Sequence, residues 1–126
     1  MNILVTGGCG FIGSNLINIL LKKKQSKINK LVNLDALTYA ANLENTKSFC
    51  EDERYFFEKA DICNFAEVRD IFINHKISHV IHLAAESHVD KSISNPTSFI
   101  DTNIVGTYNL LRASHELSIK KFHHVS

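Results

Sequence analysis

The sequence has no long hydrophobic run, no block of basic residues and no paired-cysteine spacing. No apolar stretch approaches the ~20 residues that a membrane-spanning helix needs. The N-terminus enters a short apolar run without the basic segment of a signal peptide. With 14 Lys and Arg against 13 Asp and Glu, the net charge of +1 argues against a general binder of nucleic acids or membrane surfaces. Any partner must therefore be selected by a specific site.

The cysteines are also few. Cys9, Cys50 and Cys63 are an odd number without C-x-x-C spacing, which is typical of free thiols in a reducing compartment rather than of a disulfide framework. We therefore expect a cytoplasmic protein in which each of the three fills a small space. The hydrophobic fraction of 44% is too high for a disordered chain. The sequence predicts one folded unit without repeats or linkers.

Strand-like and helix-like patterns alternate along the chain, which is typical of parallel α/β units. Short apolar runs predict strands at 3–5, 31–34, 55–57, 79–83 and 122–125. Helical spacing of apolar residues predicts helices at 11–21, 65–72 and 96–118, with a shorter one over 42–51. These elements predict a Rossmann-like, doubly wound parallel α/β sheet with the order 3-2-1-4-5, truncated after the fifth strand.

Gly7, Gly10 and Gly13 follow the first predicted strand and open the first predicted helix, which is the context of a dinucleotide-binding fingerprint. Gly7 allows a tight turn, Gly10 lets a pyrophosphate approach the backbone amides, and Gly13 lets the helix pack closely. The phosphates then lie at the positive end of the helix. Asp35, at the end of the second strand, is expected to accept hydrogen bonds from the adenine-ribose hydroxyls. Because its charge would repel a 2′-phosphate, the pattern favours NAD over NADP.

The spacing Thr6-Gly7-x-x-Gly10-x-x-Gly13 resembles the extended short-chain dehydrogenase/reductase family of nucleotide-sugar enzymes. Within that family, the stretches 35–43, 83–93 and 99–111 are similar to the dTDP-glucose 4,6-dehydratases. The run Ala-Ala-Glu-Ser-His-Val-Asp at 84–90 favours a dehydratase over a nucleotide-sugar 4-epimerase. A non-catalytic NAD-binding module of a different class remains a further alternative.

The resemblance also implies which residues contact NAD. The pyrophosphate, the adenosine ribose, the adenine and the nicotinamide half would each meet one loop at the end of a strand, and the long helix would add one contact. Phe11 and Ile12 would contact the pyrophosphate, and Asp35, Ala36, Leu37 and Thr38 the adenosine ribose. Asp61 and Ile62 would flank the adenine, and Leu83, Ala84, Ala85, Glu86 and Ser87 would run beneath the nicotinamide half. Thr102 would make the contact from the long helix. Ser87 would also reach the sugar substrate. Ala36 departs from the Lys that is common in the family, which weakens one expected contact to the ribose.

The reaction that the resemblance implies converts dTDP-glucose to dTDP-4-keto-6-deoxyglucose. NAD takes a hydride from the glucose C4, water leaves across C5 and C6, and the hydride returns at C6. The Tyr-x-x-x-Lys pair and the Thr-Asp-Glu run that carry this chemistry in the family have no counterpart here, so we expect no catalytic residue in this chain. We expect residues 1–126 to form a partial NAD-binding domain, without the C-terminal substrate domain and inactive alone.

Tyr55 and Lys59 do match Tyr-x-x-x-Lys, but they lie in a predicted strand, where four residues span about 13 Å. His75 and His79 have the spacing of zinc ligands on a helix, yet a helix-to-strand turn separates them, so no metal site is expected. We interpret His82 as structural.

His88 is interpreted in the same way. Glu86 and Asp90 could pair as in a glycosidase, but nothing else in their loop supports that chemistry. The predicted helix 96–118 packs apolar residues on the sheet. Whether its remaining apolar residues also form a homodimer, as in family members, stays open at this point.

Overall fold

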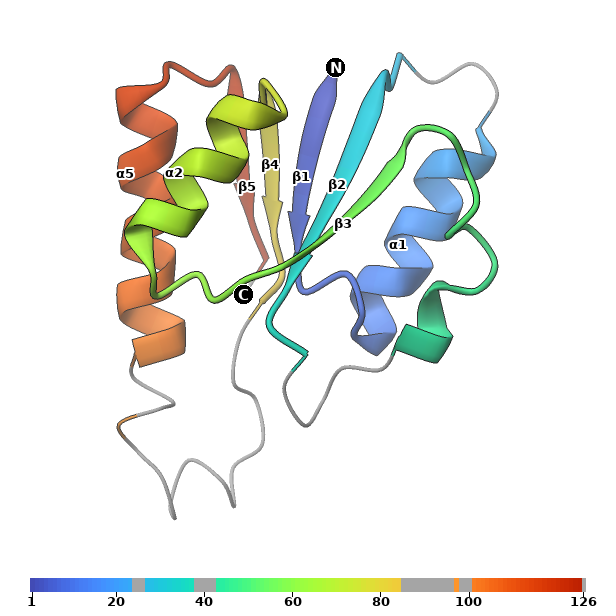
Figure 1. Cartoon of the computed structure of the whole chain (residues 1–126), viewed down its shortest axis with the longest axis horizontal. Helices are drawn as coiled ribbons and strands as arrows, with labels where there is room; N and C mark the ends of the chain where they lie inside the picture. The colour runs from blue at the N-terminus through green and yellow to red at the C-terminus, as the bar shows by residue number, and fades with distance from the viewer. Residues whose placement is uncertain (24–26, 38–42, 85–96, 98–100, 126) are drawn as a thin grey trace.

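Parallel strands form one sheet in the order β3-β2-β1-β4-β5 (Figure 1), as the sequence predicts. The computed structural model describes residues 1–23, 27–37, 43–84, 97 and 101–125. Every pairing between neighbouring strands is parallel. The Rossmann-like fold is therefore confirmed. The strands are β1 (Asn2–Thr6), β2 (Lys30–Asp35), β3 (Tyr55–Lys59), β4 (His79–His82) and β5 (Lys121–His124).

Helices cover both faces of the sheet (Figure 1). On one face lies α1 (Phe11–Lys22) with the short 3-10 helix η1 (Leu43–Thr46) beside it. On the other lie α2 (Phe65–Asn74) and α5 (Thr107–Glu116). A π-helical segment, η2 (Asp101–Gly106), leads directly into α5. Because helices cover both faces of the sheet, the central strands β1 and β2 are buried and largely apolar, whereas the edge strands β3 and β5 are more polar and exposed.

Each face of the sheet has its own hydrophobic core. Alternate residues of a strand point to opposite faces, so Leu4 belongs to one core and its neighbours Ile3 and Val5 to the other. The core under α1 consists of Ile3, Val5, Ile17, Leu21, Ile28, Leu31 and Phe49. The core under α2 and α5 consists of Leu4, Val32, Leu34, Ala60, Ile62, Val68, Ile71, Phe72, Ile77, Val80, Leu110 and Ala113.

The predicted helix over 42–51 is wrong in type and length. The segment forms only the 3-10 helix η1, followed by turns. Thr46 closes this helix, because its hydroxyl donates to the Leu43 carbonyl at 2.7 Å and its own carbonyl accepts from Phe49 and Cys50. Phe49 is buried while Leu43 is exposed, so the segment lacks the continuous apolar stripe that would hold an α-helix on the sheet.

The predicted helix 96–118 is described only in part. From Asp101 to Gly106 its backbone is π-helical, and the α-helical part α5 ends at Glu116, two residues before the predicted end. Ser118, with φ of 52°, adopts the left-handed conformation that stops the helix. Pro96 and 98–100 lie outside the described residues.

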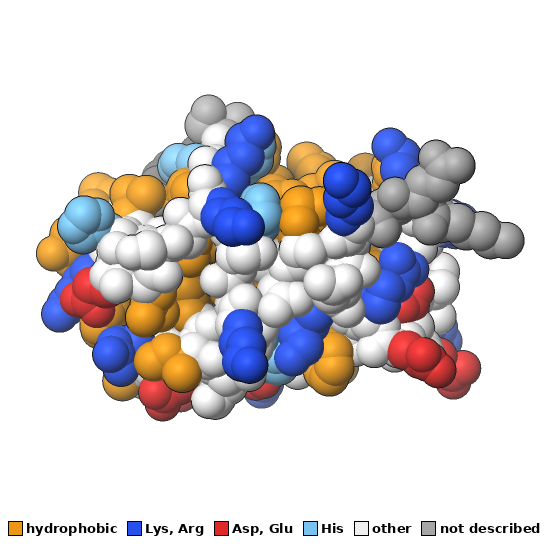
Figure 2. Space-filling view, turned by 90° about the horizontal axis from the view of Figure 1, so that it is seen from above, with side chains coloured by type: hydrophobic (Ala, Val, Ile, Leu, Met, Phe, Trp, Pro, Cys, Tyr) orange, Lys and Arg blue, Asp and Glu red, His pale blue; other side chains and the backbone are white. Residues whose placement is uncertain are grey.

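The edge where the strands begin is rich in basic side chains. Seen from above, Lys and Arg side chains are spread over this surface, and Asp and Glu side chains lie mainly toward its two ends (Figure 2). Lys30 and Lys121 begin β2 and β5. The glycine loop and Asp35 lie at the opposite edge, where the strands end, so this basic surface is not part of the predicted cofactor site.

Candidate site at the carboxyl edge of the sheet

The glycine loop connects β1 to α1 at the edge where the strands end. The Gly7 amide donates to the Leu34 carbonyl at 2.9 Å, and the Gly10 amide donates to the Gly7 carbonyl at 3.2 Å. Helix α1 begins at Phe11 with no side-chain cap, and its first backbone bond runs from Ser14 to the Gly10 carbonyl at 3.0 Å. The backbone amides of the first turn of a helix have no hydrogen-bond partner within the helix. In α1 these amides are therefore available to an anion.

Gly7 and Gly13 have the structural roles expected of them, and Gly10 leaves open space. Gly7 has a φ of 76°, a conformation that L side chains rarely adopt, and a Cβ there would meet the Ala84 amide nitrogen at 2.9 Å. A Cβ on Gly13 would lie 2.2 Å from the Gly7 carbonyl oxygen, so only glycine lets the helix approach the loop. A Cβ on Gly10 would meet only that same oxygen, at 3.4 Å. The space over Gly10 is thus open for a ligand group.

Asp35 lies where the prediction puts it, at the end of β2 and against the glycine loop. Its carboxylate is buried and accepts from the Cys9 amide at 2.9 Å through Oδ2 and from the Leu37 amide at 2.8 Å through Oδ1. Leu37 holds a φ of 57° in this turn. A carboxylate has about four acceptor positions. Among the described residues these two amides use two of the positions, which leaves acceptor capacity for hydroxyl groups of a ligand.

Cys9, within the glycine loop, is fully buried. Its sulfur accepts from the Asn33 amide at 3.4 Å, and its carbonyl accepts from the Asn45 amide at 3.0 Å. Burial first and the charge of Asp35 second raise the pKa of the Cys9 thiol to about 11, so it stays protonated. The expectation of a small space-filling residue fits buried Cys9, but Cys50 is exposed and fills no space in the core; none of the three cysteines forms a disulfide.

Asn33 and Asn45 are positioning residues that the sequence reasoning missed. Asn33 is fully buried and also donates to the Tyr55 hydroxyl at 3.0 Å. Its side chain takes the space that a Cβ on Gly8 would need, since that atom would lie 2.2 Å from Oδ1. The signal for Asn33 was present as one amide inside the apolar run 31–34. Asn45 gave no such signal, because it is an exposed polar residue of the short helix η1.

A second buried polar group, also missed as a site feature, lies where β1, β4 and α5 meet. The Thr6 hydroxyl is 2.6 Å from His82 Nδ1, and His82 Nε2 is 2.8 Å from the Thr107 hydroxyl. The Leu83 and Ala84 amides donate to the Thr6 hydroxyl at 3.0 and 3.1 Å. The interpretation of His82 as structural agrees with its burial, and the contacts bring it to the loop predicted to pass beneath the nicotinamide.

Helix α5 supports the other end of the predicted site. The Asn109 amide donates to the Ile62 carbonyl at 2.9 Å. A Cβ on Gly106 would lie 2.4 Å from the Ile62 side chain, so the turn after β3 packs directly on the helix. Asp61, beside it, is exposed and accepts from the Cys63 amide at 2.9 Å.

The remaining predicted site residues divide into two groups. Phe11 and Ile12 are 79% and 68% exposed at the start of α1, so they border the open space over Gly10 as large apolar side chains that the fold leaves uncovered. Ala36 follows Asp35 and is half-buried. Outside the described residues lie Thr38, Ala85, Glu86, Ser87, His88 and Asp90, and the side chain of Thr102.

The competing motifs do not form sites. Tyr55 and Lys59 both lie in β3, as expected, and burial raises the pKa of Tyr55 to about 12. His75 caps α2 and bonds Glu58 at 2.9 Å, whereas the His79 ring bonds Ser78. Burial, and then the N-terminal amine and nearby lysines, lower the pKa of His79. Within the part of the chain that the structure describes, no three His, Cys, Asp or Glu side chains could hold a metal ion.

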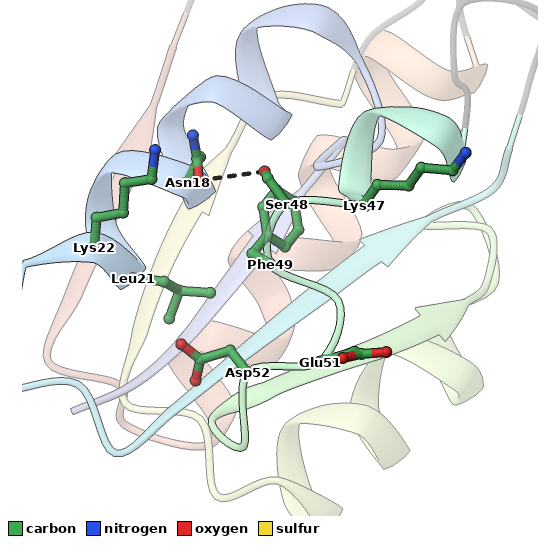
Figure 3. A pocket seen from close by; sticks show the side chains of 8 residues that line it. All are labelled: Asn18, Leu21, Lys22, Lys47, Ser48, Phe49, Glu51 and Asp52. Atoms are coloured by element: carbon green, nitrogen blue, oxygen red, sulfur yellow. Dashed lines mark hydrogen bonds between the residues drawn. The ribbon is translucent and has the colours of Figure 1, made fainter.

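A hollow of about 320 Å³ lies between α1 and the segment after η1 (Figure 3). Asn18, whose amide oxygen accepts from the Ser48 hydroxyl at 3.3 Å, lies on one side of it. Two of the four charged side chains around the hollow form ion pairs, Lys47 with Glu44 at 2.7 Å and Asp52 with Arg54 at 2.9 Å. No predicted cofactor residue lines it. The glycine loop, not this hollow, is the candidate site.

Helices long and apolar enough to cross a membrane are absent from the described residues.

Comparison with known proteins identifies the family of the chain. The family model described as GDP-mannose 4,6 dehydratase matches residues 4–126. The chain is 47% identical to the dTDP-glucose 4,6-dehydratase of Salmonella typhimurium, in an alignment that covers 100% of this chain and 37% of the relative. The chain thus spans little more than a third of the length of the curated relatives that it matches.

Two solved structures extend the comparison. A double mutant of DesIV, a dTDP-glucose 4,6-dehydratase from Streptomyces venezuelae with NAD bound, matches at a TM-score of 0.93 and 36% identity, covering 100% of this chain and 39% of that one. The UDP-glucose 4-epimerase of Thermotoga maritima matches at 0.84 and 33%, covering 98% and 37%. The likeness to nucleotide-sugar dehydratases expected from the motifs is confirmed, and the chain belongs to the family described as GDP-mannose 4,6 dehydratase.

Proposed function

We propose that residues 1–126 form the NAD-binding part of a dTDP-glucose 4,6-dehydratase. One observation carries this proposal: Asp35, the open space over Gly10 and the uncapped start of α1 occupy one continuous edge. A dinucleotide needs a carboxylate for its ribose and free amides for its phosphates, and these residues fit both. The similarity to dehydratases across the whole chain supports the substrate class.

The chain's own residues would bind and orient the cofactor. The first-turn amides of α1 would hold the pyrophosphate, with Phe11 and Ile12 beside it, and Asp35 would accept from the ribose hydroxyls. Asp61 and Ile62 would flank the adenine, and Leu83 and Ala84 would pass beneath the nicotinamide half. When bound, NAD supplies reversible hydride transfer.

The loop beyond Ala84 and the long helix complete the proposed site. We assign Thr38, Ala85, Glu86, Ser87 and Thr102 to it as well, with Ser87 also reaching the sugar. Tyr55 and Lys59 are not assigned as the catalytic pair, because they lie in a strand, where four residues span about 13 Å.

The test uses the full-length gene product that carries these residues. Calorimetric titration is expected to show NAD binding, with NADP binding more weakly because of the Asp35 charge. Asp35→Ala is expected to weaken NAD binding by about tenfold to a hundredfold, the worth of lost hydrogen bonds to a charged group. The substitution is also expected to narrow the difference in affinity between NAD and NADP, which a general loss of folding would not do.

Asp70→Ala is the matched control, since it removes an exposed carboxylate of α2 and the same charge. Equal affinity of the unchanged protein for NAD and NADP, or an Asp35→Ala protein that binds NAD normally, would refute the assignment. In a separate assay of the unchanged protein, turnover of dTDP-glucose to a 4-keto sugar would identify the dehydratase.

A nucleotide-sugar 4-epimerase is the second candidate function, because the Thermotoga maritima epimerase matches 98% of the chain at 33% identity. The same assay separates the two. An epimerase would convert UDP-glucose to its C4 epimer without loss of water, whereas a dehydratase releases a 4-keto-6-deoxy product. A non-catalytic NAD-binding module would do neither while still binding NAD.

We also propose a cytoplasmic homodimer. Ile104, Tyr108 and Leu111 follow one another at helical spacing and are 63%, 62% and 48% exposed, so one stripe of the π and α5 segments lacks apolar cover. A second copy of the chain would bury it. The three cysteines without a disulfide fit a reducing compartment. Sedimentation analysis of the gene product and of its Tyr108→Glu variant would test the dimer, and the variant is expected to be monomeric.

A further inference from the structure

His82 sits in a chain of hydrogen bonds whose direction can be derived. The Ala84 amide can only donate, so the Thr6 hydroxyl oxygen must accept from it at 3.1 Å. The Leu83 amide, at 3.0 Å, divides its proton between this oxygen and the Thr6 carbonyl at 3.2 Å. A hydroxyl has two lone pairs and one proton. With both lone pairs engaged, Thr6 must donate its proton to His82 Nδ1.

The other end of the chain agrees with this direction. Because Thr6 donates to Nδ1, a neutral His82 carries its proton on Nε2 and donates it to the Thr107 hydroxyl, 2.8 Å away. The single proton of Thr107 is then available to the Asn103 carbonyl at 3.0 Å. The opposite tautomer would leave Thr6 without an acceptor for its proton and would make two acceptors compete for that of Thr107.

The charged imidazole is excluded as well. With both ring nitrogens protonated, His82 would present Nδ1–H to the Thr6 hydroxyl, whose lone pairs are already engaged. Burial first and then the charge of His124, whose ring stacks on His82 at 4.9 Å, lower the pKa of His82 to about 4. His82 is thus neutral near pH 7, with its proton on Nε2.

The hydrogen-bonded chain from Thr6 through His82 to Thr107, called the relay below, fixes backbone as well as side chains. Thr6 immediately precedes Gly7, whose Cα lies so close to Ala84 that no Cβ would fit. Leu83 and Ala84 continue β4 out of the sheet, and Thr107 begins α5. Three elements that meet at the predicted cofactor edge are therefore held by one ring, and the relay has one fixed proton arrangement.

We propose that His82 is a positioning residue for the dinucleotide: as a neutral imidazole with its proton on Nε2, it fixes Leu83 and Ala84 against Gly7 through Thr6 and anchors them to α5 through Thr107. This inference rests on the proposed NAD site, because its effect on function is the placement of the loop beneath the nicotinamide half.

The first measurement tests the relay without any cofactor. Histidine-selective ¹⁵N NMR of the full-length gene product should give His82 the signature of a neutral ring protonated at Nε2, and Thr107→Val should alter that signal. A ring protonated at Nδ1, or one that exchanges freely between tautomers, would overturn the relay. This result is independent of whether NAD binds.

The second measurement is NAD affinity. His82→Leu and Thr107→Val remove the relay at its centre and at one end, and each is expected to weaken NAD binding by about tenfold, the scale of one lost buried hydrogen bond. His82→Gln, which retains one donor and one acceptor, should restore part of the affinity. A role limited to stability would not produce this rescue at equal folded fraction.

Two matched controls separate the relay from folding. Ser114→Ala removes a hydroxyl that donates to the Leu110 carbonyl at 2.7 Å in the same helix as Thr107, and Val80→Ala removes buried volume from the same strand as His82. Both should lower stability and leave NAD affinity unchanged. If the unchanged protein binds NAD and the His82 and Thr107 variants bind it equally well, the positioning role is refuted while the NAD site stands. If the unchanged protein does not bind NAD, the proposed function fails, and with it the positioning role.

Discussion

Replacing Gly10 by alanine should separate cofactor binding from folding. The added Cβ meets only the Gly7 carbonyl oxygen, at an ordinary contact distance of 3.4 Å, and Gly10 has φ −75° and ψ 174°, which every residue can adopt. Replacing glycine by alanine stabilises the folded protein by about 0.4–1 kcal/mol, because it lowers the conformational entropy of the unfolded chain. Alanine is a poorer N-cap than glycine by a similar amount. The free energy of unfolding should therefore change by less than about 0.5 kcal/mol.

NAD binding should nevertheless fall. The new methyl group occupies the open space through which a phosphate would reach the first-turn amides of α1. Weakening one amide–phosphate hydrogen bond by about 1.4 kcal/mol lowers the affinity tenfold, so we expect a loss of at least about that size. Because the fold is unaffected, the loss would report on the ligand alone.

Gly13→Ala provides the contrast. Its Cβ would lie 2.2 Å from the Gly7 carbonyl oxygen and 2.9 Å from the Gly8 Cα. These are backbone atoms, so no side-chain rotation relieves the overlap. Overpacking of this kind costs about 1–3 kcal/mol, of which the better helix propensity of alanine returns up to about 1 kcal/mol. This variant should lose both stability and affinity.

Urea unfolding and calorimetric titration with NAD, on both variants of the full-length gene product, test the pair. The reasoning is refuted if Gly10→Ala binds NAD with unchanged affinity, because the space over Gly10 would then not be the phosphate site. A Gly10→Ala protein that is clearly less stable would contradict the contact distances.

Two further predictions concern histidine and lysine. The lowered pKa of His82, about 4 against 6.5 in the unfolded chain, means that its contribution to stability is complete above pH 6.5 and is lost as the pH falls toward 4. It amounts to about 3 kcal/mol at most, so urea unfolding across this range should show a shallower pH dependence for His82→Gln; equal slopes would contradict the assignment. If the gene product has the proposed dehydratase activity, Lys59→Met should leave its kcat with dTDP-glucose unchanged, because Lys59 is exposed at the end of β3. A large fall in kcat would instead indicate that Tyr55 and Lys59 act as a catalytic pair.

The strands and the glycine turn were predictable because their signals are local. Ile3 to Val5 and Leu31 to Leu34 are apolar runs of strand length, and the glycines that follow the first run leave few alternatives to a turn into a helix. Asp35 could be placed because the end of a strand is easily located. The helix predicted at 65–72 also begins with a local signal, since Asn64 caps α2 and its side chain accepts from the Glu67 amide at 3.3 Å.

The missed features depend on contacts between distant segments. Asn45 bonds Cys9 across 36 positions, and His82 bonds Thr6 across 76. Periodicity shows which residues face a core, but not which two polar groups meet inside it. The helix predicted over 42–51 failed for a related reason, since Phe49 is the one buried apolar side chain among the described residues of that segment.

The first turns of α5 support both ends of the proposed cofactor site. Thr107 connects to the β4 loop through His82, while Gly106 and Asn109 hold the turn that carries Ile62. Because the helix moves as a rigid body, any displacement of it moves both contacts together. Force applied to the outer stripe of this helix by a bound neighbour would reach both halves of a dinucleotide at once. Assembly and cofactor affinity would then change each other by the same factor.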